Sequence, residues 1–182
     1  MADIYSPFDL KKEAERAYKK KDFLSAAKVF KAAAEGYSQN GDQLEAAELL
    51  NNASVAYLQA EQPEFALEAS QDTDLTFAKA GDKRRQAIAQ GNQAAAYEAL
   101  DDFESAAKAY QNSADLLKEI GDHELRATVM QSISAVQLRQ GQQLEALVTM
   151  QAGLDEIENP GIKQKILKKI LRSPFNYFNR LT

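Results

Sequence analysis

The residues that could carry out chemistry in this sequence are few. His123 is the only histidine, and Asp101, Asp102 and Glu104 crowd a turn between two helical segments. A histidine can act as a general base or a metal ligand, but His123 follows a Gly-Asp turn, so we interpret it as an exposed residue at a helix start. Acids before a helix stabilise its N-terminus, which is our interpretation of the group at 101–104. The segment Gly-Asp-Lys at 81–83 lacks the other elements of a phosphate-binding loop.

The absence of cysteine removes a further set of reactions. The 182 residues contain no cysteine, which excludes disulfides, thiolate metal sites and cysteine nucleophiles. With a single histidine, a zinc site would have to be rich in carboxylates, and no such ligand spacing occurs. The sequence therefore predicts a protein that is not an enzyme and that has neither a cofactor nor a metal site.

Charge is distributed unevenly along the chain. The net charge is −5, but residues 161–182 carry six basic residues and no acid, which leaves 16 basic against 27 acidic residues before them. An acidic body repels phosphate backbones, so we do not expect nucleic-acid binding. No apolar segment has the length of a membrane-spanning helix, and the N-terminus lacks the apolar region of a signal peptide. We expect a soluble cytoplasmic protein.

A forty-residue period organises the elements that must position any binding surface. Glycine recurs at Gly41, Gly81, Gly121 and Gly161, and alanine recurs at Ala26, Ala66, Ala106 and Ala146. A fixed period of this length is typical of a stack of similar units. We expect one domain over residues 1–182, with repeats at about 7–41, 42–81, 82–121 and 122–158 and a capping helix and tail at 159–182.

Each repeat is predicted to contain two helices. Apolar residues recur at helical spacing, Asp42 and Asp82 stand where helix caps are expected, and glycine ends each second helix. In the second repeat, Pro63 opens a helix that is expected to continue to Ala80. Small residues would let paired helices approach closely, with aromatic residues beside them. The small residues are Ala14, Ser54, Ala94 and Ser134 on the first helices and the periodic alanines on the second helices.

The last segment does not follow the period. Asn159 and Pro160 form a cap and first-position pair, and Ser173 and Pro174 are expected to end the helix. Between them lies one apolar stripe, which consists of Ile162, Ile166, Leu167, Ile170 and Leu171. We favour a cap on the solenoid, with Ile166 and Ile170 buried against Leu147, Met150 and Leu154. The alternative is attachment of residues 162–178 to an anionic membrane or an acidic partner, because lysines lie opposite the stripe.

Two segments resemble tetratricopeptide repeats. They are LNNASVAYLQAEQPEFALEAS at 50–70 and QGNQAAAYEALDDFESAAKAY at 90–110, in which a large residue, Asn, a small pair and Tyr precede Ala, an aromatic and Ala. The period of forty is similar to that of the longer-helix branch, as in soluble NSF attachment proteins and kinesin light chains. The resemblance implies an all-α, right-handed solenoid of four antiparallel helix pairs plus a C-terminal capping helix.

The resemblance also implies where a partner binds, because first helices line the concave groove of tetratricopeptide arrays. The groove residues would be Lys11, Glu15, Tyr18, Glu48, Asn51, Asn52, Val55, Ile88, Asn92, Glu98, Gln131 and Arg139. For Asn52 and Asn92, a structural hydrogen bond between helices is an equal alternative. Some family members clamp a C-terminal carboxylate, but Glu15, Ile88 and Asn92 stand where Asn, Lys and Arg are needed. We therefore do not predict binding to chaperone C-termini.

These observations lead to one functional prediction and one alternative. We expect a non-enzymatic interaction module or adaptor that binds a peptide or a partner protein in the groove. The alternative is a regulatory domain that senses a peptide or small ligand through a change in curvature. The 182 residues contain no effector domain for a sensor to control, which favours the adaptor.

Overall fold

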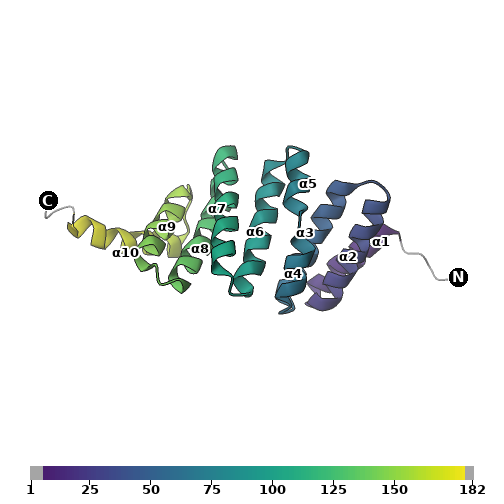
Figure 1. The fold of residues 1–182 in the computed structure, drawn as a ribbon. Coiled ribbons are helices and arrows are strands. Elements are labelled where there is room, and N and C mark those ends of the chain that lie inside the picture. Colours follow the sequence, from purple (N-terminus) through teal and green to yellow (C-terminus); the bar gives the residue numbers. More distant parts are fainter. Residues whose placement is uncertain (1–5, 179–182) are drawn as a thin grey trace.

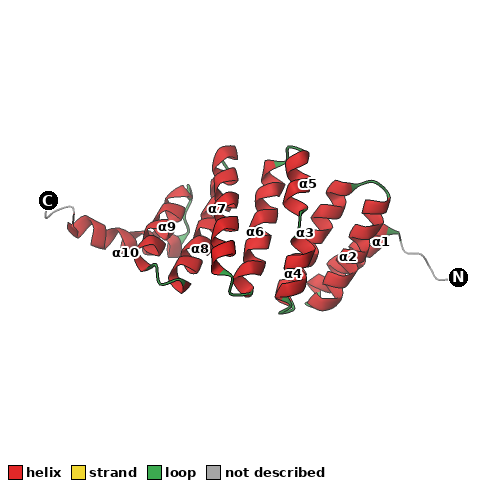
Figure 2. Cartoon of the chain, in the orientation of Figure 1, coloured by secondary structure: helices red, strands yellow, loops and turns green. Residues whose placement is uncertain are grey.

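The computed structural model describes residues 6–178, and it describes side chains for residues 6–171 (Figure 1). Every regular element in this part of the chain is an α-helix (Figure 2). The helices are α1 (Pro7–Lys19), α2 (Phe23–Gln39), α3 (Gln43–Gln59), α4 (Pro63–Ser70), α5 (Thr73–Lys79), α6 (Lys83–Ala99), α7 (Phe103–Ile120), α8 (His123–Arg139), α9 (Gln143–Glu156) and α10 (Ile162–Phe178).

Aspartate side chains begin most of the longer helices. Each accepts a hydrogen bond from the backbone N–H three residues further on, which has no partner inside the helix. These caps are Asp22, Asp42, Asp82, Asp102 and Asp122. The predicted caps at Asp42 and Asp82 are confirmed.

The turns between helices also follow the forty-residue period. Within the repeats, a left-handed residue stands between the two helices, with φ of 57–76° at Lys21, Glu61, Asp101 and Gly141. Between the repeats, Gly41, Gly81 and Gly121 adopt the same conformation, with φ of 71–85°. Glycine reaches this conformation at little cost because it has no Cβ atom. At these three positions, glycine ends the second helix as predicted.

Consecutive helices pack against one another in adjacent pairs. The pairs are α1 with α2, α3 with α4 and α5, α6 with α7, and α8 with α9. The second helix of one pair also contacts the first helix of the next, as α2 contacts α3 and α7 contacts α8. Figure 1 shows the pairs side by side in chain order. This arrangement is an all-α solenoid, as the sequence predicts.

Small residues lie buried in each pair. The periodic alanines at 26, 66, 106 and 146 and the small residues at 14, 54, 94 and 134 are all fully or almost fully buried. In the last pair, the Ser134 hydroxyl donates a hydrogen bond to the Ala146 carbonyl oxygen over 2.8 Å, which joins α8 to α9. The aromatic rings of Phe30 and Tyr110 are buried in the same core clusters. The small residues are therefore part of the packed interior of the helix pairs.

The second repeat departs from the predicted helix between Pro63 and Ala80. The chain forms α4 and α5 instead, separated by Gln71 and Asp72. Asp72 has a left-handed conformation with φ of 59°, which an α-helix does not contain. The Thr73 hydroxyl lies 2.8 Å from the Ser70 carbonyl oxygen and so gives that group a partner at the break. The prediction of one continuous helix is wrong here.

The bounds of α10 also differ from the prediction. The helix begins at Ile162, so Asn159 and Pro160 precede it and do not cap it. It continues through Ser173 and Pro174 to Phe178, whereas the sequence suggested an end at Ser173. In Figure 1, α10 leads away from the stack of helix pairs.

The packing of α10 differs from that of the predicted cap. It contacts α9, where Lys168 forms an ion pair with Asp155 over 2.6 Å, and Leu171 is buried. Ile166 and Ile170, however, are 56% and 60% exposed. The predicted burial of these two isoleucines against α9 is wrong, because α10 meets α9 through a different side of the helix.

Candidate partner-binding surface

The first helices of the four pairs carry a set of polar and apolar side chains, which we call the first-helix face. It comprises eleven of the twelve residues that the sequence predicts: Lys11, Glu15, Tyr18, Glu48, Asn52, Val55, Ile88, Asn92, Glu98, Gln131 and Arg139. They come from α1, α3, α6 and α8, and each is exposed or half-buried. The side chains are therefore accessible to a partner.

Ion pairs connect neighbouring first helices along this face. Lys11 on α1 contacts Glu45 on α3 over 2.5 Å, and this hydrogen bond raises the pKa of Lys11 above its ordinary value. Glu48 on α3 contacts Arg85 on α6 over 3.1 Å. Such half-exposed pairs contribute at most about 1 kcal/mol each. Their effect is to fix how the first helices lie relative to one another.

A second connection joins α6 to α7 and α8. Glu98 accepts a hydrogen bond from the Tyr110 hydroxyl over 3.1 Å, and Arg139 lies 3.9 Å from the same carboxylate. Burial raises the pKa of Tyr110, so the phenol keeps its proton and remains a donor at neutral pH. Glu98 and Arg139 therefore help to join α6 to α7 and α8, and part of each side chain also remains accessible on the face.

A pocket of about 300 Å³ opens on the first-helix face between α1 and α3. Its lining residues are Glu15, Tyr18, Lys19, Phe30, Asn52 and Val55. Tyr18, Phe30 and Val55 supply apolar walls. The side chains of Glu15 and Asn52 make no hydrogen bond or ion pair with any other side chain among residues 6–171. Four predicted residues thus meet around one pocket with two polar groups available to a ligand.

The other predicted residues lie further along the face. Ile88 and Asn92 on α6 are half-buried, and Gln131 on α8 is exposed. None of them lines the pocket between α1 and α3. The structure therefore groups the predicted residues of the first two repeats more closely than those of the last two.

Asn51 does not belong to the first-helix face. Its side chain is 6% exposed, and its Oδ1 atom lies 2.9 Å from the Thr73 hydroxyl on α5. It therefore points toward its own second helix, so its prediction as a groove residue is wrong. The position forty residues later shows the same orientation, because a Cβ at Gly91 would lie 3.7 Å from Ser113 on α7.

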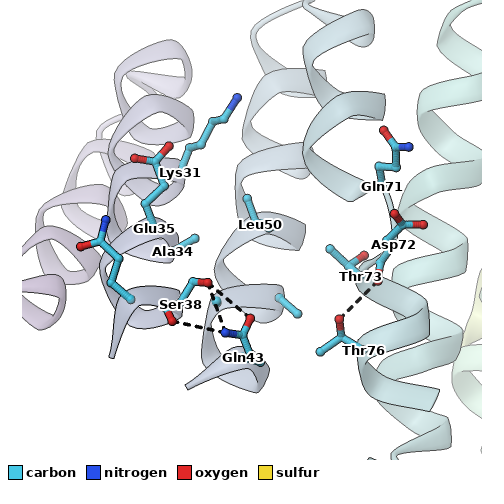
Figure 3. A pocket seen from close by; sticks show the side chains of 13 residues that line it. Lys31, Ala34, Glu35, Ser38, Gln43, Leu50, Gln71, Asp72, Thr73 and Thr76 are labelled. Carbon is cyan, nitrogen blue, oxygen red and sulfur yellow. Dashed lines mark hydrogen bonds between the residues drawn. The ribbon is translucent and has the colours of Figure 1, made fainter. Parts of the chain in front are cut away.

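A second pocket lies beside the break between α4 and α5, and sequence reasoning missed it. It has a volume of about 420 Å³ and extends from α2 over α3 to the break (Figure 3). Lys31 and Glu35 line the α2 side, Leu50 lies on α3, and Gln71 and Asp72 line the opposite side. The signal in the sequence is the segment SQDTD, because Ser, Asp and Thr side chains compete for backbone hydrogen bonds and favour turns.

His123 is an exposed residue at the start of α8, as predicted. Its ring contacts Glu156, and Arg126 contacts the same carboxylate, so the three side chains join α8 to the end of α9. Within residues 6–171, no group of three or more histidine, cysteine or acidic side chains is arranged to hold a metal ion. The contacts of His123 fit a structural role.

A solenoid of paired helices with an accessible first-helix face defines a helical-repeat protein of the tetratricopeptide type. The family model described as soluble NSF attachment protein matches residues 4–171. The chain belongs to this family of helical-repeat interaction adaptors. No curated protein matches the sequence. Among the described helices, none is long and apolar enough to cross a membrane.

Proposed function

We propose that this protein is a non-enzymatic adaptor whose first-helix face binds a partner protein. The observation that supports this most directly is the pocket between α1 and α3, where Glu15, Tyr18, Asn52 and Val55 meet. A concave site with apolar walls and a few polar groups is the usual form of a recognition pocket. Membership of an adaptor family supports the same function.

The lining of the pocket indicates which partner side chain would enter it. The walls formed by Tyr18, Phe30 and Val55 suit an aromatic or branched aliphatic side chain, which would lose apolar surface to water on binding. The exposed Asn52 amide can donate to a backbone carbonyl of the partner. Glu15 disfavours a carboxylate and favours a basic residue beside the apolar anchor. We also propose that the adaptor works in the cytoplasm.

A substitution at Asn52 tests this function. Asn52→Arg places a longer side chain at the mouth of the pocket, and because Asn52 is exposed the fold should tolerate the change. Partners captured by the wild-type chain would be identified, purified and titrated against both proteins. We expect the dissociation constant to rise at least about tenfold, which corresponds to about 1.4 kcal/mol. Asn112→Arg, at an exposed position on α7, is the matched control and should bind as the wild type does.

The pocket beside the α4–α5 break favours a second candidate function, a domain that senses a small polar ligand. Its lining combines Glu35, Gln71 and Asp72 with the apolar side chain of Leu50. A ligand bound there would raise the melting temperature in proportion to the logarithm of its concentration. Screening small polar compounds against the wild type and Gln71→Trp, which fills the pocket, tests this function. Stabilisation of both proteins alike, or of neither, would contradict it.

A further inference from the structure

The exposed side of α10 carries three isoleucines in one line. Ile162, Ile166 and Ile170 are 79%, 56% and 60% exposed. They are four residues apart, so they lie on one side of a helix with 3.6 residues per turn. Scattered exposed apolar residues are ordinary, but three large ones in succession on one helix face are not. We refer to them as the isoleucine stripe.

Lysines flank the isoleucine stripe on both sides. By helical geometry, Lys163 lies on one flank and Lys165 and Lys169 lie on the other. Within residues 6–171, none of these three lysines forms an ion pair, and residues 161–171 contain no acid. The lysine charges are therefore available to an external anionic surface.

The contact between α10 and α9 leaves the stripe free. Lys168, paired with Asp155, and the buried Leu171 lie on the side of α10 away from the stripe. The helix is thus anchored to the body of the protein through one side, while the isoleucines and the three flanking lysines point outward. In Figure 1, α10 leads away from the stack of helix pairs.

We propose that α10 attaches the protein to an anionic membrane surface, with the helix lying in the plane of the surface. Residues 162–171 would insert the isoleucine stripe among the lipid chains, while Lys163, Lys165 and Lys169 would contact the negatively charged headgroups. A helix with an apolar face, flanking lysines and no acid has the composition of interfacial membrane helices. The two attractions add, because the stripe supplies apolar burial and each lysine adds an electrostatic term.

The charge pattern favours a membrane over an acidic protein partner. A flat anionic surface attracts cations on both flanks of an interfacial helix, and lysines occupy both flanks of the isoleucine stripe. Residues 1–160 carry a net charge of −11, so the net attraction to an anionic surface comes from the basic segment that follows them. Attachment through one helix would leave the first-helix face open to solvent.

Sedimentation of the full chain with vesicles tests this inference. The vesicles contain phosphatidylcholine alone or phosphatidylcholine with phosphatidylserine, at low and high salt. We expect binding only to vesicles with phosphatidylserine, and weaker binding at high salt. Replacing Lys163, Lys165 and Lys169 by Gln should reduce the partition coefficient roughly a hundredfold. Replacing Ile162, Ile166 and Ile170 by Gln should reduce it by at least about tenfold, with an unchanged melting temperature because these side chains are exposed.

A matched variant distinguishes attraction of the α10 lysines to the membrane from an effect of the net charge of the whole protein. Lys28, Lys79 and Lys108 are exposed lysines on α2, α5 and α7, and replacing them by Gln removes the same charge without altering α10. This variant should bind vesicles as the wild type does. The inference is overturned if the wild type does not bind phosphatidylserine vesicles, or if both lysine variants lose binding equally. It is also overturned if the isoleucine variant binds vesicles as the wild type does but has lost a self-association, or an interaction with another protein, that the wild type shows.

Discussion

The Thr73 hydroxyl lies 2.9 Å from Oδ1 of Asn51, and this contact connects the break between α4 and α5 to the middle of α3. Both side chains are buried. The hydroxyl has one hydrogen and also lies 2.8 Å from the Ser70 carbonyl oxygen, so it donates to one of the two acceptors at a time. Through this contact, Asn51 faces its own second helix and not the first-helix face, and the break between α4 and α5 is joined to α3.

Removing this hydroxyl should destabilise the protein. Thr73→Val keeps the shape of the side chain but removes the one donor that Oδ1 of Asn51 and the Ser70 carbonyl oxygen share. We expect the free energy of unfolding to fall by about 1–3 kcal/mol in chemical denaturation. Thr128→Val is the control, because Thr128 is exposed and contacts only a carbonyl of its own helix. Equal effects of the two substitutions would show that the contact does not stabilise the break.

The cap at Asp82 should make stability depend on pH. Its carboxylate accepts hydrogen bonds from the backbone N–H and the side chain of Arg85, and these bonds lower the pKa of Asp82 below its ordinary value of 3.8. Above pH 3.8 the carboxylate is charged in both the folded and the unfolded protein. There, the free energy of unfolding of the wild type should exceed that of Asp82→Ala by about 1 kcal/mol. The difference should disappear as the pH falls through the lowered folded-state pKa, where the native carboxylate takes up its proton.

Denaturation at a series of pH values measures this difference. Asp82→Asn is the matched control, because asparagine also caps helices but does not titrate. Its stability relative to Asp82→Ala should stay constant across the acidic range. A difference between wild type and Asp82→Ala that persists unchanged below pH 3 would contradict the assigned cause.

The buried alanines should not tolerate a larger side chain. Ala106 is fully buried in the core cluster that contains Tyr110 and Ala94. Ala106→Leu adds three carbon atoms to a packed contact, and we expect it to cost roughly 1–3 kcal/mol in the free energy of unfolding. Ala99→Leu, at an exposed position on α6, is the control and should change stability by less than about 0.5 kcal/mol. A neutral effect of Ala106→Leu would show that the helices of this pair are more loosely packed.

The fourth repeat should open more readily than the third. On α9, Leu144 and Val148 are exposed and Gln142 provides no side-chain cap, whereas α7 has a capping Asp102 and a buried Tyr110. Backbone amides of α9 should therefore exchange with deuterium faster than those of α7, since fewer buried contacts oppose local opening. Equal protection of the backbone amides of α7 and α9 would contradict this prediction.

The forty-residue period predicts most of the fold because its physical causes are local. Aspartate caps, glycine at left-handed turns and small residues at close contacts act within a few residues of their position, so they are visible in the sequence. The α4–α5 break is harder to predict, because its local signal is only the segment SQDTD and its buried contact with Asn51 joins residues 22 apart. The sequence pattern around Gln71 has neither glycine nor proline to mark the end of a helix.

The candidate surface was predictable only in part. Helical spacing places Asn51 and Asn52 one residue apart, and a shift of one residue on a helix changes which neighbour a side chain faces. Asn52 lines the pocket between α1 and α3, whereas Asn51 is buried. The α10 stripe was misassigned for a related reason, because periodicity identifies an apolar face and does not identify what covers it.

The affinity of a purified partner for the wild type and for Asn52→Arg tests the central proposal most directly. We predict that the substitution raises the dissociation constant at least about tenfold by blocking the pocket, while the partner binds Asn112→Arg as it binds the wild type. Titration calorimetry with folded variants of matched melting temperature provides the measurement. Equal affinities for all three proteins, or equal losses in both variants, would contradict binding through the first-helix face.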